Sequence, residues 1–189
     1  PQDVAFLPNG MFLVGDGLGG NNRIVVRNAD GSYHSEFGEG GDAVHQFASV
    51  HSLAMGPEQK LYALDRDKRD VKVFRQTAAL DSVDYPIYEY ETTWTGLDLP
   101  LDITLGEDAA WVTDIRPPKI VKYNLDGSQD YVWNLPIEGP HMWIEMHSLS
   151  ADEEGNLYGT DNQAGRPQKM VQRRDADPDH IVPRPWFEN

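Results

Sequence analysis

Cysteine is missing from the 189 residues of this chain. Disulfide bonds and thiolate metal sites are therefore excluded. The absence fits the cytoplasm and also many exported bacterial proteins, and between the two we favour a periplasmic or extracellular location. Long hydrophobic runs are missing as well, since no apolar stretch approaches the ~18 residues of a membrane span. The chain opens on a strand-like segment without a leader, so we expect the natural N-terminus to lie upstream.

Basic residues are scarce, with 16 Lys and Arg against 31 Asp and Glu and a formal net charge of −15. Such a surface repels phosphate backbones and anionic membranes, so we expect no nucleic-acid partner. The same field favours cationic ligands and metal ions. A well-solvated acidic surface explains the composition equally well.

Helical periodicity is also absent, and a repeat of strands and turns takes its place. Each copy runs through a turn into a strand that ends on aspartate, and the spacings between these aspartates are 49, 49 and 47 residues. A period near fifty built from strands alone predicts an all-β fold, a β-propeller of the NHL-repeat type. The copies begin at Pro1-Gln2-Asp3, Val50-His51-Ser52, Pro100-Leu101-Asp102 and Met146-His147-Ser148, and the aspartates are Asp16, Asp65, Asp114 and Asp161.

The repeat predicts one propeller domain over residues 1–189, because a single blade cannot bury its own faces. The predicted blades cover about residues 1–45, 46–98, 99–144 and 145–189. Four repeats could close a ring, but we favour a six-bladed ring that lacks two N-terminal blades here. Self-association of the chain is another way to complete it.

Three local features complete the predicted blades. The Asn-Gly and Asp-Gly pairs indicate hairpin turns. Residues 76–99 form the longest irregular passage, which we expect to be a decorated loop, with the fourth strand of the second repeat near Ile87–Tyr90. The charged run 65–70 is predicted to be a solvated loop, and the last blade takes its fourth strand from Ile181–Val182.

His51 and His147 occupy the same repeat position two blades apart. Equivalent positions of propeller blades point at one shared axis, so these imidazoles could meet at one metal ion. The alternative is that both are structural histidines at strand starts. His141 and Glu145 are secondary metal candidates near His147, and Glu145 could also orient a ligating histidine.

The repeated aspartates resemble a catalytic series but are predicted to be structural. An aspartate at a strand end accepts backbone N–H bonds from the following loop. Four copies indicate architecture, because an active site needs no such symmetry.

Several segments resemble one known family, the peptidyl-α-hydroxyglycine α-amidating lyases, which are six-bladed propellers of the NHL class. The resemblance covers nearly the whole chain and is diffuse over residues 76–145. Its more specific part consists of the two histidines and Arg66. The segments are Pro1-Gln2-Asp3-Val4, Gly15-Asp16-Gly17, Asn22-Arg23-Ile24-Val25, Glu36-Phe37-Gly38, Gln46-Phe47, His51-Ser52-Leu53-Ala54, Asp65-Arg66, Met146-His147, Glu154-Gly155-Asn156-Leu157-Tyr158 and Gln168-Lys169.

The resemblance implies a zinc ion held by three histidines from alternate blades, two of them His51 and His147, with the third upstream of Pro1. It also implies that Arg66 holds a substrate carboxylate or stabilises developing negative charge. Two positions depart from the family pattern. Leu18 replaces the catalytic tyrosine, so no general base is identified, and Ser148 replaces an aspartate tied to a structural calcium.

The leading functional prediction is a metal-dependent, lyase-like or hydrolase-like enzyme that acts on a small-molecule or peptide ligand on the propeller axis. The alternative is a non-catalytic NHL propeller that binds protein, peptide or glycan. A lactonase-like hydrolase with an axial calcium is a third reading, for which Gln2 and Leu101 are poor ligands.

Overall fold

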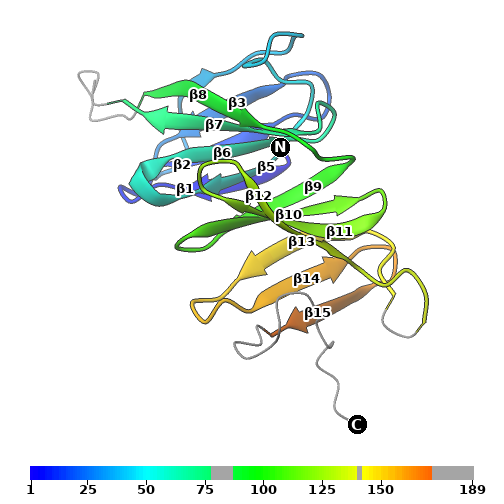
Figure 1. The fold of residues 1–189 in the computed structure, drawn as a ribbon. Coiled ribbons are helices and arrows are strands. Elements are labelled where there is room, and N and C mark those ends of the chain that lie inside the picture. The colour runs from blue at the N-terminus through cyan, green and yellow to red at the C-terminus, as the bar shows by residue number, and fades with distance from the viewer. Residues whose placement is uncertain (78–86, 140–141, 172–189) are drawn as a thin grey trace. The chain divides into compact units, whose positions relative to one another are not determined.

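The structure is a computed structural model that describes residues 1–77, 87–139 and 142–171. Over these ranges the chain forms fifteen strands and a single short 3-10 helix, Pro57–Gln59, so the fold is all-β as predicted (Figure 1). No helix in the described part is long and apolar enough to cross a membrane.

The strands form four antiparallel sheets in which neighbours in sequence are neighbours in space, as in propeller blades (Figure 1). The first two sheets belong to one compact unit, Pro1–Pro100, and the last two to a second, Leu101–Asn189. The sheets are β1 (Asp3–Phe6), β2 (Phe12–Asp16), β3 (Arg23–Arg27) and β4 (Tyr33–Phe37); β5 (Val50–Met55), β6 (Leu61–Asp65), β7 (Asp70–Gln76) and β8 (Tyr88–Trp94); β9 (Pro100–Leu105), β10 (Ala109–Ile115), β11 (Pro118–Asn124) and β12 (Gln129–Asn134); and β13 (Met146–Ala151), β14 (Leu157–Asp161) and β15 (Arg166–Met170).

The Asp-Gly pairs form the hairpin turns that the sequence predicts. In the β3–β4 turn, Asp30 accepts a hydrogen bond from the Ser32 amide at 2.9 Å, and Gly31 has a φ of 84°. The β11–β12 turn repeats this arrangement, with Asp126 accepting from Ser128 at 2.8 Å. Positive φ carries little strain at glycine, so the turn chemistry sets where each hairpin reverses.

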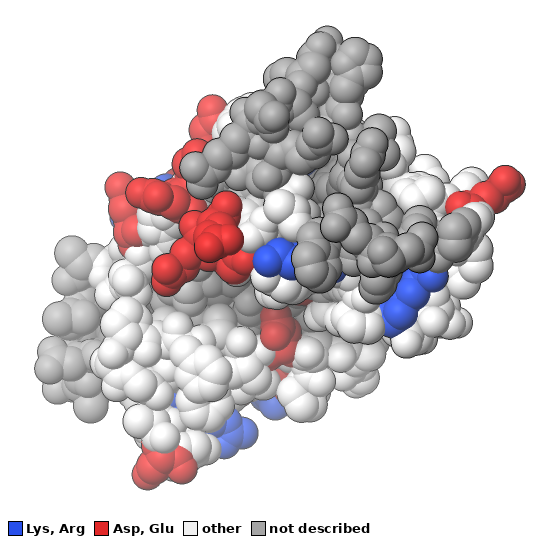
Figure 2. All heavy atoms as spheres, turned by 90° about the horizontal axis from the view of Figure 1, so that it is seen from below, with Lys and Arg blue, Asp and Glu red and all other residues white. Residues whose placement is uncertain are grey.

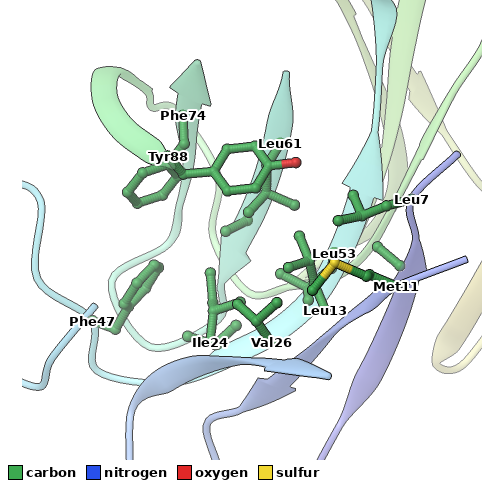
Figure 3. Close-up of a cluster of buried hydrophobic side chains, with 13 residues drawn as sticks. Leu7, Met11, Leu13, Ile24, Val26, Phe47, Leu53, Leu61, Phe74 and Tyr88 are labelled. Atoms are coloured by element: carbon green, nitrogen blue, oxygen red, sulfur yellow. The ribbon is translucent and has the colours of Figure 1, made fainter. Parts of the chain in front are cut away.

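Each sheet has two faces, which we name by their positions in the first repeat. The leading face carries Val4 and Phe12 and their equivalents, and the trailing face carries Leu13 and Ile24 and their equivalents. In the first unit the trailing face of the first sheet packs against the leading face of the second. Figure 3 shows this cluster of buried side chains, which includes Leu13, Ile24, Val26, Leu53, Leu61, Phe47 and Phe74.

The second unit is packed through the same repeat positions. Its core joins trailing-face residues of the third sheet, Ile120 with Trp111 and Trp133 beside it, to leading-face residues of the fourth. Leu149 and Leu157 occupy the positions that Leu53 and Leu61 occupy in the first unit. Two independent pairs of sheets therefore stack through one set of positions, as expected for a repeat fold.

Surface charges are partly paired. Arg75 lies 2.6 Å from Glu89 and Lys122 2.7 Å from Asp130 across neighbouring strands, and Lys60, before β6, lies 2.8 Å from Glu91 of β8. On the face drawn in Figure 2 the acidic side chains lie in several separate groups. Exposed pairs of this kind add little stability.

The strand predicted near Ile87–Tyr90 is confirmed as β8, because the alternation Tyr88-Glu89-Tyr90-Glu91 presents aromatic and charged side chains to opposite faces. One local prediction was wrong. The run 65–70 is not uniformly solvated, since Asp65 and Asp70 at its ends are buried. The predicted strand Ile181–Val182 lies outside the described residues.

The packing predicts a large stability difference between two leucines. Leu61 is fully buried between the first two sheets, whereas Leu18 is 51% exposed in a loop. Leu61→Ala should lower the free energy of unfolding by about 2–5 kcal/mol through the lost transfer energy and the cavity left behind. Leu18→Ala should change it by less than about 0.5 kcal/mol. Urea unfolding followed by circular dichroism measures both, and equal effects would contradict the assignment of the core.

Candidate functional site: two equivalent histidine bulges

His51 lies at a β-bulge in the first strand of the second sheet. Val50 pairs with Asp65 and Ser52 with Leu64, so His51 is the extra residue between two ladder positions. Its side chain is largely buried, with 8% exposure. Bulges redirect side chains and often lie beside active sites.

His147 lies at the same bulge of the fourth sheet. Met146 pairs with Asp161 and Ser148 with Thr160, which leaves His147 as the extra residue. Its side chain is half-buried. The structure thus confirms that the two histidines are equivalent in local geometry as well as in sequence, down to the same irregularity of the ladder.

The strand-ending aspartates hold the segments that lead into the two bulges. Asp65 accepts hydrogen bonds from the amides of Ala48 and Ser49 at 2.8 and 2.9 Å. It also accepts one from Lys68 in the following loop at 3.1 Å, as the sequence predicts. The carboxylate therefore fixes two consecutive residues just before His51.

Asp161 does the same before His147. It accepts hydrogen bonds from the amides of Ile144 at 2.7 Å and Glu145 at 3.3 Å, and from Gln163 and Ala164 in the following loop at 3.0 and 2.8 Å. Burial alone would raise the pKa of Asp161, but these backbone donors outweigh it and the pKa lies below its ordinary value.

A second pair of aspartates holds the residues that follow the histidines. Asp3 accepts a hydrogen bond from the Leu53 amide at 2.8 Å and another from the Ser52 hydroxyl at 3.0 Å. In the second unit Asp102 accepts from the Leu149 amide at 2.6 Å. Each bulge is therefore fixed on both sides, by an aspartate of its own sheet and by one from the preceding sheet.

Gly17 allows a close approach beside the first bulge. A Cβ atom at this position would lie 2.2 Å from the carbonyl oxygen of Val50, directly before His51. Any side chain would displace one of the two segments. Gly15-Asp16-Gly17 is thus part of the packing around His51, a role that sequence reasoning did not assign.

Arg66 follows Asp65 and lies close to the same segment. Its amide donates to the carbonyl of Ser49 at 3.0 Å, and its guanidinium pairs with Asp67 at 2.8 Å. The hydrogen bond to Asp67 comes first among the factors that raise the pKa of Arg66. A substrate anion would have to share the guanidinium with Asp67, so the predicted role as an anion clamp stays a prediction.

The secondary candidates are placed only in part. The carboxylate of Glu145 accepts a hydrogen bond from the Asn162 side chain at 2.9 Å, and the Asn162 amide donates to the Glu145 carbonyl at 3.3 Å. Asn162 thus repeats the backbone bond that Arg66 makes in the second sheet. His141 lies outside the described residues.

The two predicted ligands lie in different units of the chain. His51 belongs to the first unit and His147 to the second, so a shared ion stays a prediction. Within residues 1–77, 87–139 and 142–171, no group of three or more His, Cys, Asp or Glu side chains is placed to hold a metal ion.

A buried charge cluster beside the first bulge departs from the repeat. In the first, third and fourth sheets, the strand-ending aspartate pairs across the ladder with a basic residue, namely Arg23, Lys119 and Arg166. In the second sheet its ladder partner is Asp70. The fully buried Lys72 takes over the positive charge, with its Nζ 2.6 Å from Asp70 and 3.4 Å from Asp65. Burial raises the pKa of Asp70, against the opposing effect of Lys72.

Sequence reasoning missed the bulges and the two aspartates of the preceding strands. The sequence did carry a signal for these two aspartates, because the third position of the repeat alternates between aspartate and serine: Asp3, Ser52, Asp102 and Ser148. No comparable signal marks the bulges, since ladder register depends on the partner strand.

Comparison with known proteins supports the fold. No family model and no curated protein matches the chain. Among solved structures, a catalytically inactive histidine-to-alanine variant of virginiamycin B lyase from Staphylococcus aureus with quinupristin is similar, with a TM-score of 0.66 and 18% identity over 92% of this chain and 53% of that one.

Two further structures are similar. A streptogramin B lyase has a TM-score of 0.63 and 17% identity over 93% of this chain and 56% of that one. The WD40 repeats of RRP9 have a TM-score of 0.65 and 11% identity over 89% and 47%. The chain spans about half the length of these proteins. The similarities show a β-propeller arrangement of four blades and do not decide between lyase and scaffold.

The anchoring of the bulges predicts a local effect of two conservative substitutions. Asp65→Asn and Asp161→Asn remove a charged acceptor from consecutive amides, so hydrogen exchange at residues 48–53 and 144–149, respectively, should accelerate about tenfold or more. Asp16→Asn is the matched control, because Asp16 bonds to the side chains of Asn21 and Arg23. Mass spectrometry of exchanged peptides measures the change, and uniform acceleration in all three variants would contradict the anchoring role.

Asp161 also predicts a pH dependence. Because its folded-state pKa is depressed, its stabilising effect is complete above the ordinary value near pH 4 and is lost as the pH falls through the folded pKa. The free energy of unfolding of the wild type should therefore fall more steeply between about pH 5 and 3 than that of Asp161→Asn. Parallel slopes in urea titrations across this range would show that the carboxylate does not bind the backbone as described.

Proposed function

We propose that this chain supplies two imidazole ligands, His51 and His147, to the zinc site of a propeller enzyme with lyase-like chemistry. One observation carries the proposal: the two histidines occupy the same bulge of alternate sheets. Each bulge is held by a strand-ending aspartate on one side and an aspartate of the preceding sheet on the other. Rigidly positioned imidazoles are what a metal site requires.

The donor set fits zinc in kind and is incomplete in number. Neutral imidazole is a good zinc ligand, and a catalytic site uses three protein ligands with one open position. Two come from the described residues, and the resemblance to amidating lyases places the third on a preceding blade. Bound zinc would polarise an oxygen of the substrate or lower the pKa of bound water.

The chain's own residues would position the substrate around that site. Arg66 offers a guanidinium to a substrate carboxylate in competition with Asp67, 2.8 Å away. Gly17 lets the loop before Leu18 lie directly against the His51 strand. Leu18 is exposed and cannot move a proton, so the base must come from another residue.

The neighbouring structures support histidine-dependent lyase chemistry on this fold without assigning it here. In virginiamycin B lyase, replacement of one histidine by alanine gives a catalytically inactive protein. By analogy with the amidating-lyase resemblance, the substrate class is a peptide that ends in α-hydroxyglycine and the product is glyoxylate.

A non-catalytic propeller that binds a protein or peptide is the second candidate. It is favoured by Leu18 at the position of the family's tyrosine and by the structural similarity to WD40 repeats. A chain that binds no zinc through its bulge histidines would support this reading.

The proposal predicts the zinc affinity of single-histidine variants. His51→Ala and His147→Ala should each weaken zinc binding by about tenfold or more, measured by competition with a chromophoric chelator, because each removes one of few ligands. His34→Ala is the matched control, since His34 lies in β4 and contacts Ser35 at 3.0 Å.

Three outcomes separate the readings. Equal zinc affinity in the wild type and both bulge variants would refute the metal site. The lyase reading would be supported if the bulge variants lose zinc and the wild type releases glyoxylate from an α-hydroxyglycine peptide. Zinc binding without turnover would retain the metal site and reject the reaction.

A further inference from the structure

The leading face of the first sheet is apolar and exposed. Val4 and Phe6 of β1 are 42% and 71% exposed, and Phe12 and Val14 of β2 lie beside them on the same face. The rings of Phe6 and Phe12 are 5.8 Å apart, which makes the patch continuous. Contiguous apolar surface of this kind indicates an interaction site.

The repeat shows what covers this face elsewhere. In the second sheet the positions of Val4, Phe12 and Val14 are taken by Leu53, Leu61 and Ala63, counted from the shared strand-ending aspartate. These three are at most 5% exposed. They are buried because the trailing face of the first sheet packs on them (Figure 3).

The second unit repeats the arrangement independently. Leu149 and Leu157 hold the same leading-face positions in the fourth sheet, are 6% and 5% exposed, and pack against Ile120 of the third sheet. Two leading faces are thus each covered by the trailing face of a preceding sheet. The first sheet has the same apolar pattern, but there Val4 and Phe6 are 42% and 71% exposed.

The charges at the edge of the exposed face are compatible with burial. Arg23 lies 3.2 Å from Asp16 and 2.9 Å from Glu36, so the charged side chains there are paired with one another. In the second sheet the equivalent position also holds a charge cluster, around Asp65, and it is buried. Arg27, which lies opposite Phe12 on the same face, bonds to the carbonyl oxygen of Gly31 at 3.4 Å, so a covering sheet would have to leave its guanidinium at the rim or supply it with an acceptor.

The three described strands of the last sheet, β13–β15, do not present a matching surface. Its trailing face carries Ser150, Tyr158, Thr160, Pro167 and Lys169. Tyr158 is 39% exposed and the serine, threonine and proline are exposed as well. By contrast, the trailing face that covers Leu53 and Leu61 is aliphatic, so neither this chain's last sheet nor that of a second copy is suited to the exposed face.

We propose that the leading face of the first sheet is the docking surface for a further sheet of the same repeat. The occupant presents an aliphatic trailing face, as the first sheet does with Ala5, Leu13 and Ile24. It is a sheet other than the four that the described residues form. The proposal concerns packing alone and holds whether or not the chain binds zinc.

The test uses the absence of cysteine, which lets one introduced thiol report on the face. Phe6→Cys is placed in the 189-residue chain and in an extended chain that carries an added copy of residues 1–49 before Pro1. The added copy brings the trailing face already known to cover a leading face. Val44→Cys is the matched control, because Val44 is 56% exposed in a loop off the patch.

The rate of reaction with a thiol reagent such as DTNB decides the proposal. In the 189-residue chain both thiols should react quickly and independently of protein concentration. In the extended chain the rate at the Phe6→Cys thiol should fall by about tenfold or more, because a docked sheet must open before the reagent enters. The rate at Val44→Cys should be unchanged. Limited proteolysis of the extended chain should find the added copy protected.

Three results would overturn it. An unprotected thiol in a folded extended chain, or an added copy that stays protease-sensitive, would show that no sheet docks there. Protection that grows with the concentration of the 189-residue chain would identify a second copy as the occupant. Protection in the dilute 189-residue chain would mean that the chain covers the face itself.

Discussion

Face-to-face packing of successive sheets is the interaction on which the rest of this structure depends. A sheet that is apolar on both faces cannot be stable alone, and burial of its side chains supplies the main driving force. In both units the same repeat positions meet, with Leu53 and Leu61 in one and Leu149 and Leu157 in the other. This packing places the first strand of each sheet reproducibly, and the histidine bulges lie on those strands.

Buried carboxylates then set the local geometry. Asp65 and Asp161 are nearly inaccessible, and their charge is tolerated because backbone amides surround it. A buried charge without such partners would be strongly destabilising. In the second sheet Lys72 adds a counter-charge between two aspartates, so the first bulge lies beside the most heavily charged buried cluster described. The same residue type thus repeats for structural reasons while it positions candidate ligands.

Equivalent backbone frames carry different side chains, and this is where function enters. The residue after the strand-ending aspartate is Gly17 in the first sheet, Arg66 in the second and Asn162 in the fourth. Arg66 and Asn162 make the same backbone bond but differ in charge. A repeat fold can therefore keep its scaffold and vary single positions, which explains how similar propellers include both lyases and WD40 repeats.

The sequence by itself determined the all-β fold, the four repeats, the Asp-Gly turns and the equivalence of His51 and His147, because each depends on local patterns and a constant period. It also predicted that the repeated aspartates are structural. Asp65 and Asp161 accept backbone amides as expected, whereas Asp16 bonds to the side chains of Asn21 and Arg23. Only the tertiary structure revealed the bulges, the bonds from Asp3 and Asp102, and the close approach of Gly17 to Val50. These depend on register between strands and on contact between sheets, which residues far apart in sequence create together.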